Sequence, residues 1–318
     1  MIDRVCIVGA GAIGSLYAGH LAQVCDVWVL TRRPEHAAAL NEHGLRVSGR
    51  SDIHARVAAT ADAATVPPFD LGIVATKATE LDTAASRLDG GFPDALLVTV
   101  QNGLGAEAIV RSHGRWPLVS GVTFMSGTRH SDTHVEYILD TPTWLGPYEG
   151  TPFARVEEVA DLLVESGLEA EALPDLRPAQ WSKLIFNAAV NSVAALTGLP
   201  HDPHFAAEDE PGDLGHLLRD LVDEGKAVAA AAGVELHDDP WEMNVLATRR
   251  GHWHYPSMLE DVDARRATEV DLITGAIVRE GDRLGVDVPL HRAMYRLIKA
   301  KEASWKAEAT PTPEGRRR

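Results

Sequence analysis

This sequence has few cysteines, fewer basic than acidic residues and no long apolar run. Each of these shortages argues against a class of protein. The 318 residues include two cysteines, Cys6 and Cys25, and no CxxC pair, so no disulfide framework is expected and a reducing cytoplasm is favoured. Acidic residues outnumber basic ones by 46 to 30, a formal charge of −16 that disfavours nucleic acid as a partner. The longest apolar stretch, 184–199, is interrupted by Asn187 and Asn191, so we expect no membrane span.

Metal-binding patterns and a targeting segment are also lacking. The fourteen histidines never form an HExxH-type pair, and His252 with His254 is too little to predict a site, so we expect no metal. An acid and a base precede the first apolar run, which suits a strand better than a signal peptide.

The first half of the chain alternates short β-rich runs with helical patterns, which predicts βαβ units and a parallel, doubly wound sheet. The expected strands are 4–8, 27–31, 71–76 and 95–100, followed by a strand-like region at 117–146. The expected helices are 13–24, 34–43, 80–88 and 151–165.

The second half is predicted to be almost entirely helical after a connection at 167–178. The expected helices are 179–197, 213–232, 240–249, 257–263, 268–284 and 289–304. We therefore expect an α/β domain at 1–172, an all-helical domain at 173–306 and a disordered tail at 307–318.

A GxGxxG motif follows the first predicted strand and opens the first predicted helix. Gly9 permits the tight turn, Gly11 lets the backbone approach a pyrophosphate, and Gly14 lets the helix pack closely on the strand. Ala12 and Ile13 then supply N–H donors at the helix N-terminus. A glycine-rich turn without a ligand is the alternative, but the strand–loop–helix context favours a dinucleotide.

The second predicted strand ends in Thr31, Arg32 and Arg33, where an NAD-preferring site usually carries an acid. A guanidinium matches a 2′-phosphate with charge-assisted bonds, so we predict NADP(H) as the cofactor and Arg32 as its contact. Two solvated surface arginines are the alternative, above all for Arg33.

Lys183, Asn187 and Asn191 are spaced four residues apart in an otherwise apolar helical segment, which places them on one helix face. A narrow wet face is the alternative. A solvated face, however, usually carries several charged residues, whereas this one offers one lysine and two carboxamides. That combination is better suited to binding a polar substrate and donating a proton.

Several further polar residues have a plain structural interpretation, and three of them also suit a functional one. Ser257 and Glu260 predict a capping box, although a hydroxyl at a helix N-terminus also suits a carboxylate ligand. Glu269 is expected in the first turn of the helix 268–284, where it would stabilise the dipole. Lys77 and Asn102 follow predicted buried strands, at the sheet edge where α/β proteins bind ligands, but a loop lysine and an Asn-Gly turn are the alternatives.

Taken in order, these motifs resemble the ketopantoate reductases (2-dehydropantoate 2-reductases) from the glycine loop to about Trp305. They are GAGAIG, TKA at 76–78, QNG at 101–103, WSKL with Asn187 and Asn191, SMLEDV at 257–262 and TEVDLITGAIV at 268–278. The pair formed by Lys183 and Asn187 is also similar to one in the wider 3-hydroxyacid dehydrogenase group.

The resemblance implies an N-terminal Rossmann domain, an all-helical domain and an active site in the cleft between them. Lys183 would protonate the carbonyl oxygen of 2-dehydropantoate as NADPH delivers hydride, with Glu269 nearby. Burial should lower the pKa of this lysine and Glu269 should raise it. Asn187, Asn191 and Ser257 would hold the hydroxyl and carboxylate of the substrate.

The resemblance also implies that Lys77 and Asn102 lie where cofactor and substrate meet. The expected partner is thus a small 2-oxo acid; a homodimer is compatible with the sequence. The sequence departs from the family at His254, where an asparagine is common, and this departure leaves the substrate open. Reduction of another branched 2-oxo acid or an imine, and a non-catalytic NADP-binding sensor, are the alternatives.

Overall fold

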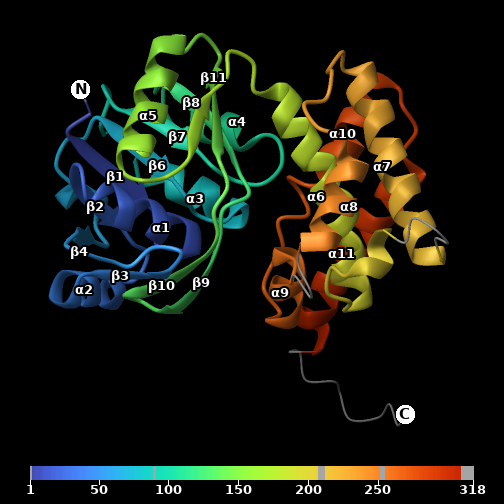
Figure 1. The fold of residues 1–318 in the computed structure, drawn as a ribbon, viewed down its shortest axis with the longest axis horizontal. Helices are drawn as coiled ribbons and strands as arrows, with labels where there is room; N and C mark the ends of the chain where they lie inside the picture. The colour runs from blue at the N-terminus through green and yellow to red at the C-terminus, as the bar shows by residue number, and fades with distance from the viewer. Residues whose placement is uncertain (1, 89–90, 207–211, 251–254, 309–318) are drawn as a thin grey trace. The chain divides into compact units, whose positions relative to one another are not determined.

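The chain forms two compact units in a computed structural model that describes residues 2–88, 91–206, 212–250 and 255–308 (Figure 1). Unit 1 comprises Met1–Gln101 and Gly105–Leu176, and unit 2 comprises Asn102–Leu104 and Arg177–Arg318. A parallel sheet in unit 1 and a helical unit 2 confirm the predicted fold class. Among the described residues, no helix is both long and apolar enough to span a bilayer.

An eight-stranded sheet forms the framework of unit 1, in the order β12-β11-β8-β7-β6-β1-β2-β5. Its strands are β1 (Arg4–Val8), β2 (Asp26–Leu30), β5 (Ala58–Thr60), β6 (Leu71–Val74), β7 (Leu96–Thr99), β8 (Leu118–Thr123), β11 (Thr143–Tyr148) and β12 (Ala170–Ala172). All neighbouring strands are parallel except β8 and β11. The central strands β6 and β7 are buried throughout, as expected for strands covered on both faces.

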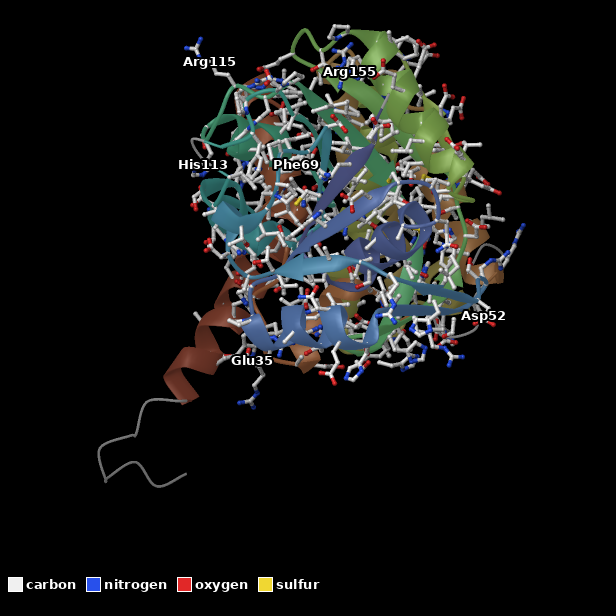
Figure 2. All side chains as sticks on the ribbon, turned by 90° about the vertical axis from the view of Figure 1, so that its left-hand side faces the viewer. Glu35, Asp52, Phe69, His113, Arg115 and Arg155 are labelled. Carbon is white, nitrogen blue, oxygen red and sulfur yellow. The ribbon has the colours of Figure 1, made fainter. Side chains whose placement is uncertain are left out.

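The α-helices described in unit 1 are α1 (Ala12–Leu21), α2 (Pro34–His43), α3 (Leu81–Ser86), α4 (Ala106–Arg111) and α5 (Phe153–Glu165), with the short 3-10 helices η1 (Ala63–Thr65) and η2 (Ala78–Glu80). Four of these five α-helices coincide with predicted helices, although α1 ends three residues early, and α4 was not predicted. Pro34 occupies the first position of α2, where its missing N–H costs nothing. The charged side chains of Glu35 and Arg115 project outward from this unit (Figure 2), as their exposure requires.

A second, four-stranded sheet in unit 1 was not predicted. Its order is β4-β3-β10-β9, with strands β3 (Leu45–Gly49), β4 (Ile53–Ala55), β9 (Ser126–Ser131) and β10 (His134–Leu139). Helix α1 contacts both this sheet and the large one, so every residue from Gly14 to Leu21 is buried. A helix enclosed on both sides needs no solvent-facing polar stripe, which explains why α1 is mostly apolar and its polar residues Ser15 and His20 are buried.

Unit 2 is built around α6 (Arg177–Thr197), which contacts each of the other α-helices described in this unit. Those helices are α7 (Asp213–Ala231), α8 (Pro240–Arg250), α9 (Ser257–Asp263), α10 (Thr274–Leu284) and α11 (Pro289–Glu308), with the 3-10 helix η3 (Pro203–Ala206). Because α6 is central, the side chains around its circumference are buried, polar ones included.

Four sequence predictions about local structure need correction. The helix expected at 268–284 begins at Thr274, and the capping box fails because Pro256 is the N-cap of α9 and Ser257 its first residue. The connection at 167–178 contains β12, which is held by pairing with β11, and α6 begins at Arg177. Of the predicted tail, residues 307 and 308 continue α11; residues 309–318 lie outside the described residues, as does His254.

Candidate active site

The glycine loop between β1 and α1 is shaped by close packing at two of its three glycines. Gly9 has a φ of +101°, and a Cβ there would lie 2.6 Å from Thr76 Cγ2. A Cβ on Gly14 would lie 2.0 Å from the Gly9 carbonyl oxygen, so this residue must be glycine for α1 to approach the loop. A Cβ on Gly11 would meet no atom within 4 Å. Packing of the protein therefore does not explain Gly11, whereas close approach of a pyrophosphate would.

The N-terminus of α1 has the features of an anion site. Gly11 is its N-cap and provides no side-chain cap, and the first turn contains no acidic residue. Ala12 and Ile13 are half-buried at this end of the helix. Its first N–H groups and the positive end of its dipole would thus be available to a phosphate.

Two buried polar atoms near this loop also fit a bound nucleotide. The Gln101 side-chain amide donates to the carbonyl oxygens of Val74 (2.8 Å) and Thr76 (3.0 Å), which joins the carboxyl ends of β6 and β7. Within the described residues, Gln101 Oε1 and Thr76 Oγ1 are buried without a hydrogen-bond partner. Buried polar atoms normally have partners, so this edge is suited to receive a polar ligand. The sequence analysis gave neither side chain a role. The available signal was that Thr76 begins the TKA motif and Gln101 begins the QNG motif.

The residues after β2 differ sharply in exposure. Thr31 is buried and its hydroxyl donates to the Arg33 carbonyl oxygen at 2.9 Å. Arg33 forms an ion pair with Asp132 at 2.5 Å, whereas the Arg32 side chain is 74% exposed and pairs with Glu80 at 3.1 Å. The guanidinium of Arg32 is therefore more accessible to a ligand than that of Arg33. No sequence signal pointed to Asp132, which is 99 residues from Arg33.

The predicted stripe on α6 is buried. Lys183, Asn187 and Asn191 are all less than one tenth exposed, which excludes the wet-face alternative. Asn191 Oδ1 accepts a hydrogen bond from the Met258 backbone N–H at 3.3 Å, so the far end of the stripe meets the N-terminus of α9. Ser257, the residue before Met258, is exposed beside that contact.

Lys183 is the titratable member of the stripe. Burial lowers the pKa of its ammonium group from 10.5 to about 8, although the charge of nearby Glu269 raises it. Burial therefore outweighs the carboxylate, a balance that the sequence left undecided. A lysine with this pKa can release a proton near neutral pH far more readily than an exposed one.

Glu269 lies in a turn before α10 instead of in the first turn of that helix. Its carbonyl oxygen accepts backbone hydrogen bonds from Leu272 and Ile273, both at 3.1 Å. The Leu272 carbonyl oxygen in turn accepts from the Leu104 N–H at 2.9 Å, which keeps residues 269–273 from continuing the helix. The turn therefore depends on a segment more than 160 residues earlier in the chain.

That segment, Asn102–Leu104, belongs to unit 2 and also contacts the Glu269 carboxylate. Asn102 Nδ2 donates to Glu269 Oε2 at 3.1 Å. Gly103 has a φ of +98°, and a Cβ on it would lie 1.9 Å from the Leu272 carbonyl oxygen, so only glycine fits. The structure thus brings Asn102, Glu269 and Lys183 together in unit 2. The glycine loop, Arg32 and the exposed Lys77 belong to unit 1.

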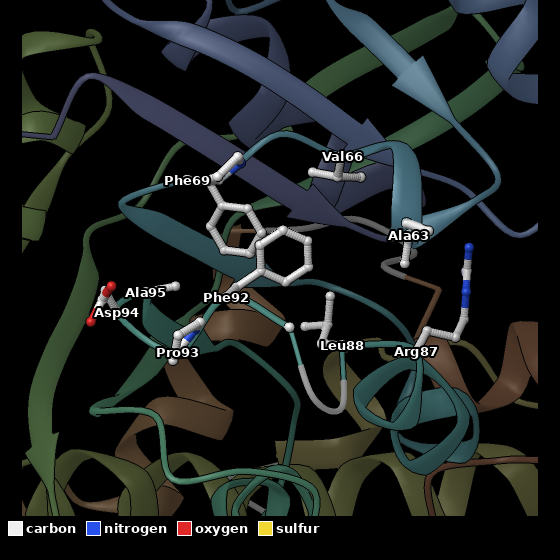
Figure 3. Close-up of a pocket in the computed structure, with 12 residues that line it drawn as sticks. Ala63, Val66, Phe69, Arg87, Leu88, Phe92, Pro93, Asp94 and Ala95 are labelled. Atoms are coloured by element: carbon white, nitrogen blue, oxygen red, sulfur yellow. The ribbon is translucent and has the colours of Figure 1, made fainter.

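A cavity of about 530 Å³ in unit 1 shares no lining residue with this candidate site (Figure 3). Phe69 and Phe92 line it, with ring centroids 4.4 Å apart. These residues precede β6 and β7, at the amino ends of the strands, whereas α/β sheets bind nucleotides at the carboxyl ends. The aromatic end of the cavity therefore lies away from the sheet edge that carries the glycine loop. Among the described residues, no cluster of His, Cys, Asp and Glu is suited to hold a metal.

Comparisons with known proteins find similarity to ketopantoate reductases along nearly the whole chain. Family models described as "Ketopantoate reductase PanE/ApbA" and its "C terminal" match residues 5–150 and 175–302. A 2-dehydropantoate 2-reductase of Archaeoglobus fulgidus is 32% identical over 95% of this chain and 99% of its own length.

Solved structures show the same similarity. A PanE/ApbA family ketopantoate reductase from Ralstonia eutropha JMP134 has a TM-score of 0.86 and 28% identity, covering 95% of this chain and 99% of its own. D-mandelate dehydrogenase in a ternary structure with NADH and anilino(oxo)acetate has a TM-score of 0.85 and 25% identity with the same coverage.

Proposed function

Because the chain belongs to the ketopantoate reductase family, we propose that it reduces 2-dehydropantoate to pantoate with NADPH. It is an oxidoreductase that acts on a CH–OH group, as its relatives named 2-dehydropantoate 2-reductase are. The single observation that carries the proposed chemistry is Lys183, buried beside Glu269 with a pKa of about 8.

Lys183 is the proposed general acid. When bound, a nicotinamide cofactor supplies the hydride for the carbonyl carbon. The Lys183 ammonium donates a hydrogen bond to the carbonyl oxygen, stabilises the negative charge that develops there, and transfers its proton. Glu269 keeps this lysine protonated near neutral pH, since its charge opposes the effect of burial.

The remaining residues of the stripe are the proposed substrate contacts. Asn187 and Asn191 offer carboxamide donors and acceptors on the same face of α6 as Lys183. Ser257 offers an exposed hydroxyl at the first position of α9, next to the Asn191 contact, where a carboxylate is favoured. Asn102 holds Glu269 and is the proposed fourth contact.

The cofactor assignment rests on unit 1. Gly9, Gly11 and Gly14 with the N-terminus of α1 are the proposed pyrophosphate site. Gln101 Oε1 and Thr76 Oγ1, which have no hydrogen-bond partner among the described residues, support a ligand at the same edge. Arg32 is the proposed contact of the 2′-phosphate, because the three residues directly after β2 are a threonine and two arginines and the Arg32 guanidinium is exposed. Lys77, exposed after β6, is proposed to add positive charge near the phosphates.

A second candidate is reduction of a different, bulkier 2-oxo acid on the same scaffold. The similarity to D-mandelate dehydrogenase, solved with NADH and anilino(oxo)acetate, favours this candidate over reduction of an imine. A sensor without catalysis is disfavoured by a buried lysine and carboxylate that interact. Both cysteines, Cys6 and Cys25, are unpaired, which supports a reducing compartment such as the cytoplasm.

The proposal is tested by NADPH oxidation with 2-dehydropantoate and a panel of bulkier 2-oxo acids. Lys183→Ala should lower turnover by roughly two orders of magnitude or more, the scale of general acid catalysis. Lys226→Ala, which removes a more exposed lysine from α7, is the matched control and should leave turnover unchanged. Near-normal turnover of the Lys183 variant would disprove its role, and preference for another acid would favour the second candidate.

The pH profile gives an independent readout of the same residue. Reduction needs a protonated lysine, so kcat/KM should fall as the pH rises through about 8. Glu269→Gln removes the charge that raises the lysine pKa, so the fall should move to lower pH. An unmoved profile would show that another group controls the reaction.

A further inference from the structure

The carboxyl ends of three neighbouring strands place Arg32 and Glu80 on either side of the glycine loop. Strand β1 pairs with β2 and β6, and Val8 is level with Leu30 and with Val74. Gly9 follows Val8 directly, Arg32 follows Leu30 by two residues, and Glu80 ends the 3-10 helix η2 after β6. The ion pair between Arg32 Nη1 and Glu80 Oε2, 3.1 Å long, therefore lies at the edge of the sheet that carries the dinucleotide motif.

Arg33 is held away from this role by its own partners. Its guanidinium binds Asp132 in the turn between β9 and β10 at 2.5 Å, and Arg129 binds the same carboxylate oxygen at 3.1 Å. The Asp132 carbonyl oxygen also bonds His36 on α2 at 2.8 Å. Arg33 thus ties α2 to the small sheet, and its release would break a connected set of contacts.

Arg32 and Glu80, in contrast, form a pair that a ligand can exchange easily. Their side chains are 74% and 46% exposed, and exposed ion pairs contribute little free energy. A 2′-phosphate offers a guanidinium more charge than a carboxylate does. A carboxylate near the adenosine ribose, for its part, is the group that NAD-preferring sites use to bind the 2′-hydroxyl. The ion pair therefore joins a guanidinium that suits the 2′-phosphate of NADP to a carboxylate that suits the 2′-hydroxyl of NAD.

We infer that the Arg32–Glu80 pair selects between cofactors and lets the protein use both NADP and NAD. This inference deepens the proposed function and rests on it. With NADP(H), the 2′-phosphate replaces Glu80 as the partner of Arg32, and the displaced carboxylate repels the phosphate. With NAD(H), Glu80 accepts a hydrogen bond from the ribose hydroxyl and remains paired with Arg32. Glu80 consequently weakens the preference for NADP that Arg32 creates.

Direct binding measurements test this inference without catalysis. Dissociation constants for NADPH and NADH would be measured by fluorescence titration at low and physiological salt. Glu80→Gln removes the repulsion and should tighten NADPH about fivefold, on the scale of one screened charge pair, while weakening NADH a few-fold. Arg32→Ala should weaken NADPH at least tenfold and leave NADH nearly unchanged. Adenosine 2′,5′-bisphosphate and adenosine 5′-monophosphate should repeat both trends.

The matched control is Glu280→Gln, which removes an acid from the exposed Arg283–Glu280 pair in unit 2 and should change neither affinity. If Glu80→Gln changes the ratio of NADPH affinity to NADH affinity by less than twofold, the inference is overturned, while the proposed function is unaffected. Wild-type protein that binds neither nucleotide would overturn both the inference and the proposed function. Absence of turnover with 2-dehydropantoate, with the predicted affinity changes intact, would overturn only the proposed substrate.

Discussion

The burial of Lys183 should destabilise the folded protein in a way that depends on pH. Its pKa is about 8 in the folded state against 10.5 for an exposed lysine, a gap that corresponds to about 3 kcal/mol. Below pH 8 the lysine is protonated in both states, so the whole cost of burying the ammonium is present. Between pH 8 and 10.5 the unfolded chain binds more protons, so the free energy of unfolding should rise with pH.

Lys183→Met isolates this effect, because methionine fills a similar volume without charge. At pH 7 we expect the variant to be the more stable protein by up to about 3 kcal/mol, less the cost of leaving Glu269 without its cation. At pH 9.5 most of the wild-type lysine is neutral, so the advantage of the variant should shrink by about 2 kcal/mol.

Urea unfolding of both proteins at pH 7 and 9.5 measures these differences. Groups that titrate equally in the two proteins cancel in the comparison, so the remaining dependence on pH belongs to residue 183. A difference in the free energy of unfolding that stays constant between the two pH values would refute the reasoning, since it would show that the lysine does not titrate near 8.

Two further predictions concern glycines. Gly14→Ala should destabilise the protein by at least 1 kcal/mol, since the new Cβ would lie 2.0 Å from the Gly9 carbonyl oxygen, whereas Gly11→Ala should fold normally but weaken NADPH binding about tenfold. Thermal melts and nucleotide titrations of the two variants would separate the effects, and equal loss of stability in both would contradict the packing argument. Gly103→Ala should lower turnover at least tenfold, because a Cβ 1.9 Å from the Leu272 carbonyl oxygen would displace the turn that holds Glu269. The melting temperature should fall as well, because the contact is as close as the one at Gly14 and residue 103 has a positive φ. Unchanged activity would show that the turn adapts.

The elements that sequence alone predicted well carry their signals within a few residues. Strand β1 at 4–8, helix α2 at 34–43 and helix α9 at 257–263 have the predicted bounds. An apolar run before glycines defines the first, and a proline at a helix start defines the second. Local patterns were sufficient where local residues determine the structure.

Some of the elements that sequence missed depend on distant residues. Strand β3 pairs with β10, whose residues lie almost ninety positions away, so no local period revealed the small sheet. The start of α10 was placed too early because the backbone bonds of residues 104 and 272 hold the preceding turn. The spacing of Lys183, Asn187 and Asn191 predicted a shared face, and their burial agrees, while their chemical roles stay predictions. Glu80 and Asp132 showed no signal of their own.

The division of the chain into two units affects what happens when the helical unit is produced as a separate fragment. Three residues, Asn102–Leu104, belong to the helical unit although the polypeptide on both sides of them belongs to the sheet unit. A fragment beginning at Arg177 would therefore be produced without the amide that holds Glu269 and without the N–H bound by Leu272. The segment from Arg177 onward thus lacks residues that position the carboxylate beside its own lysine, and transfer of that half to another protein would also require a matching loop at 102–104.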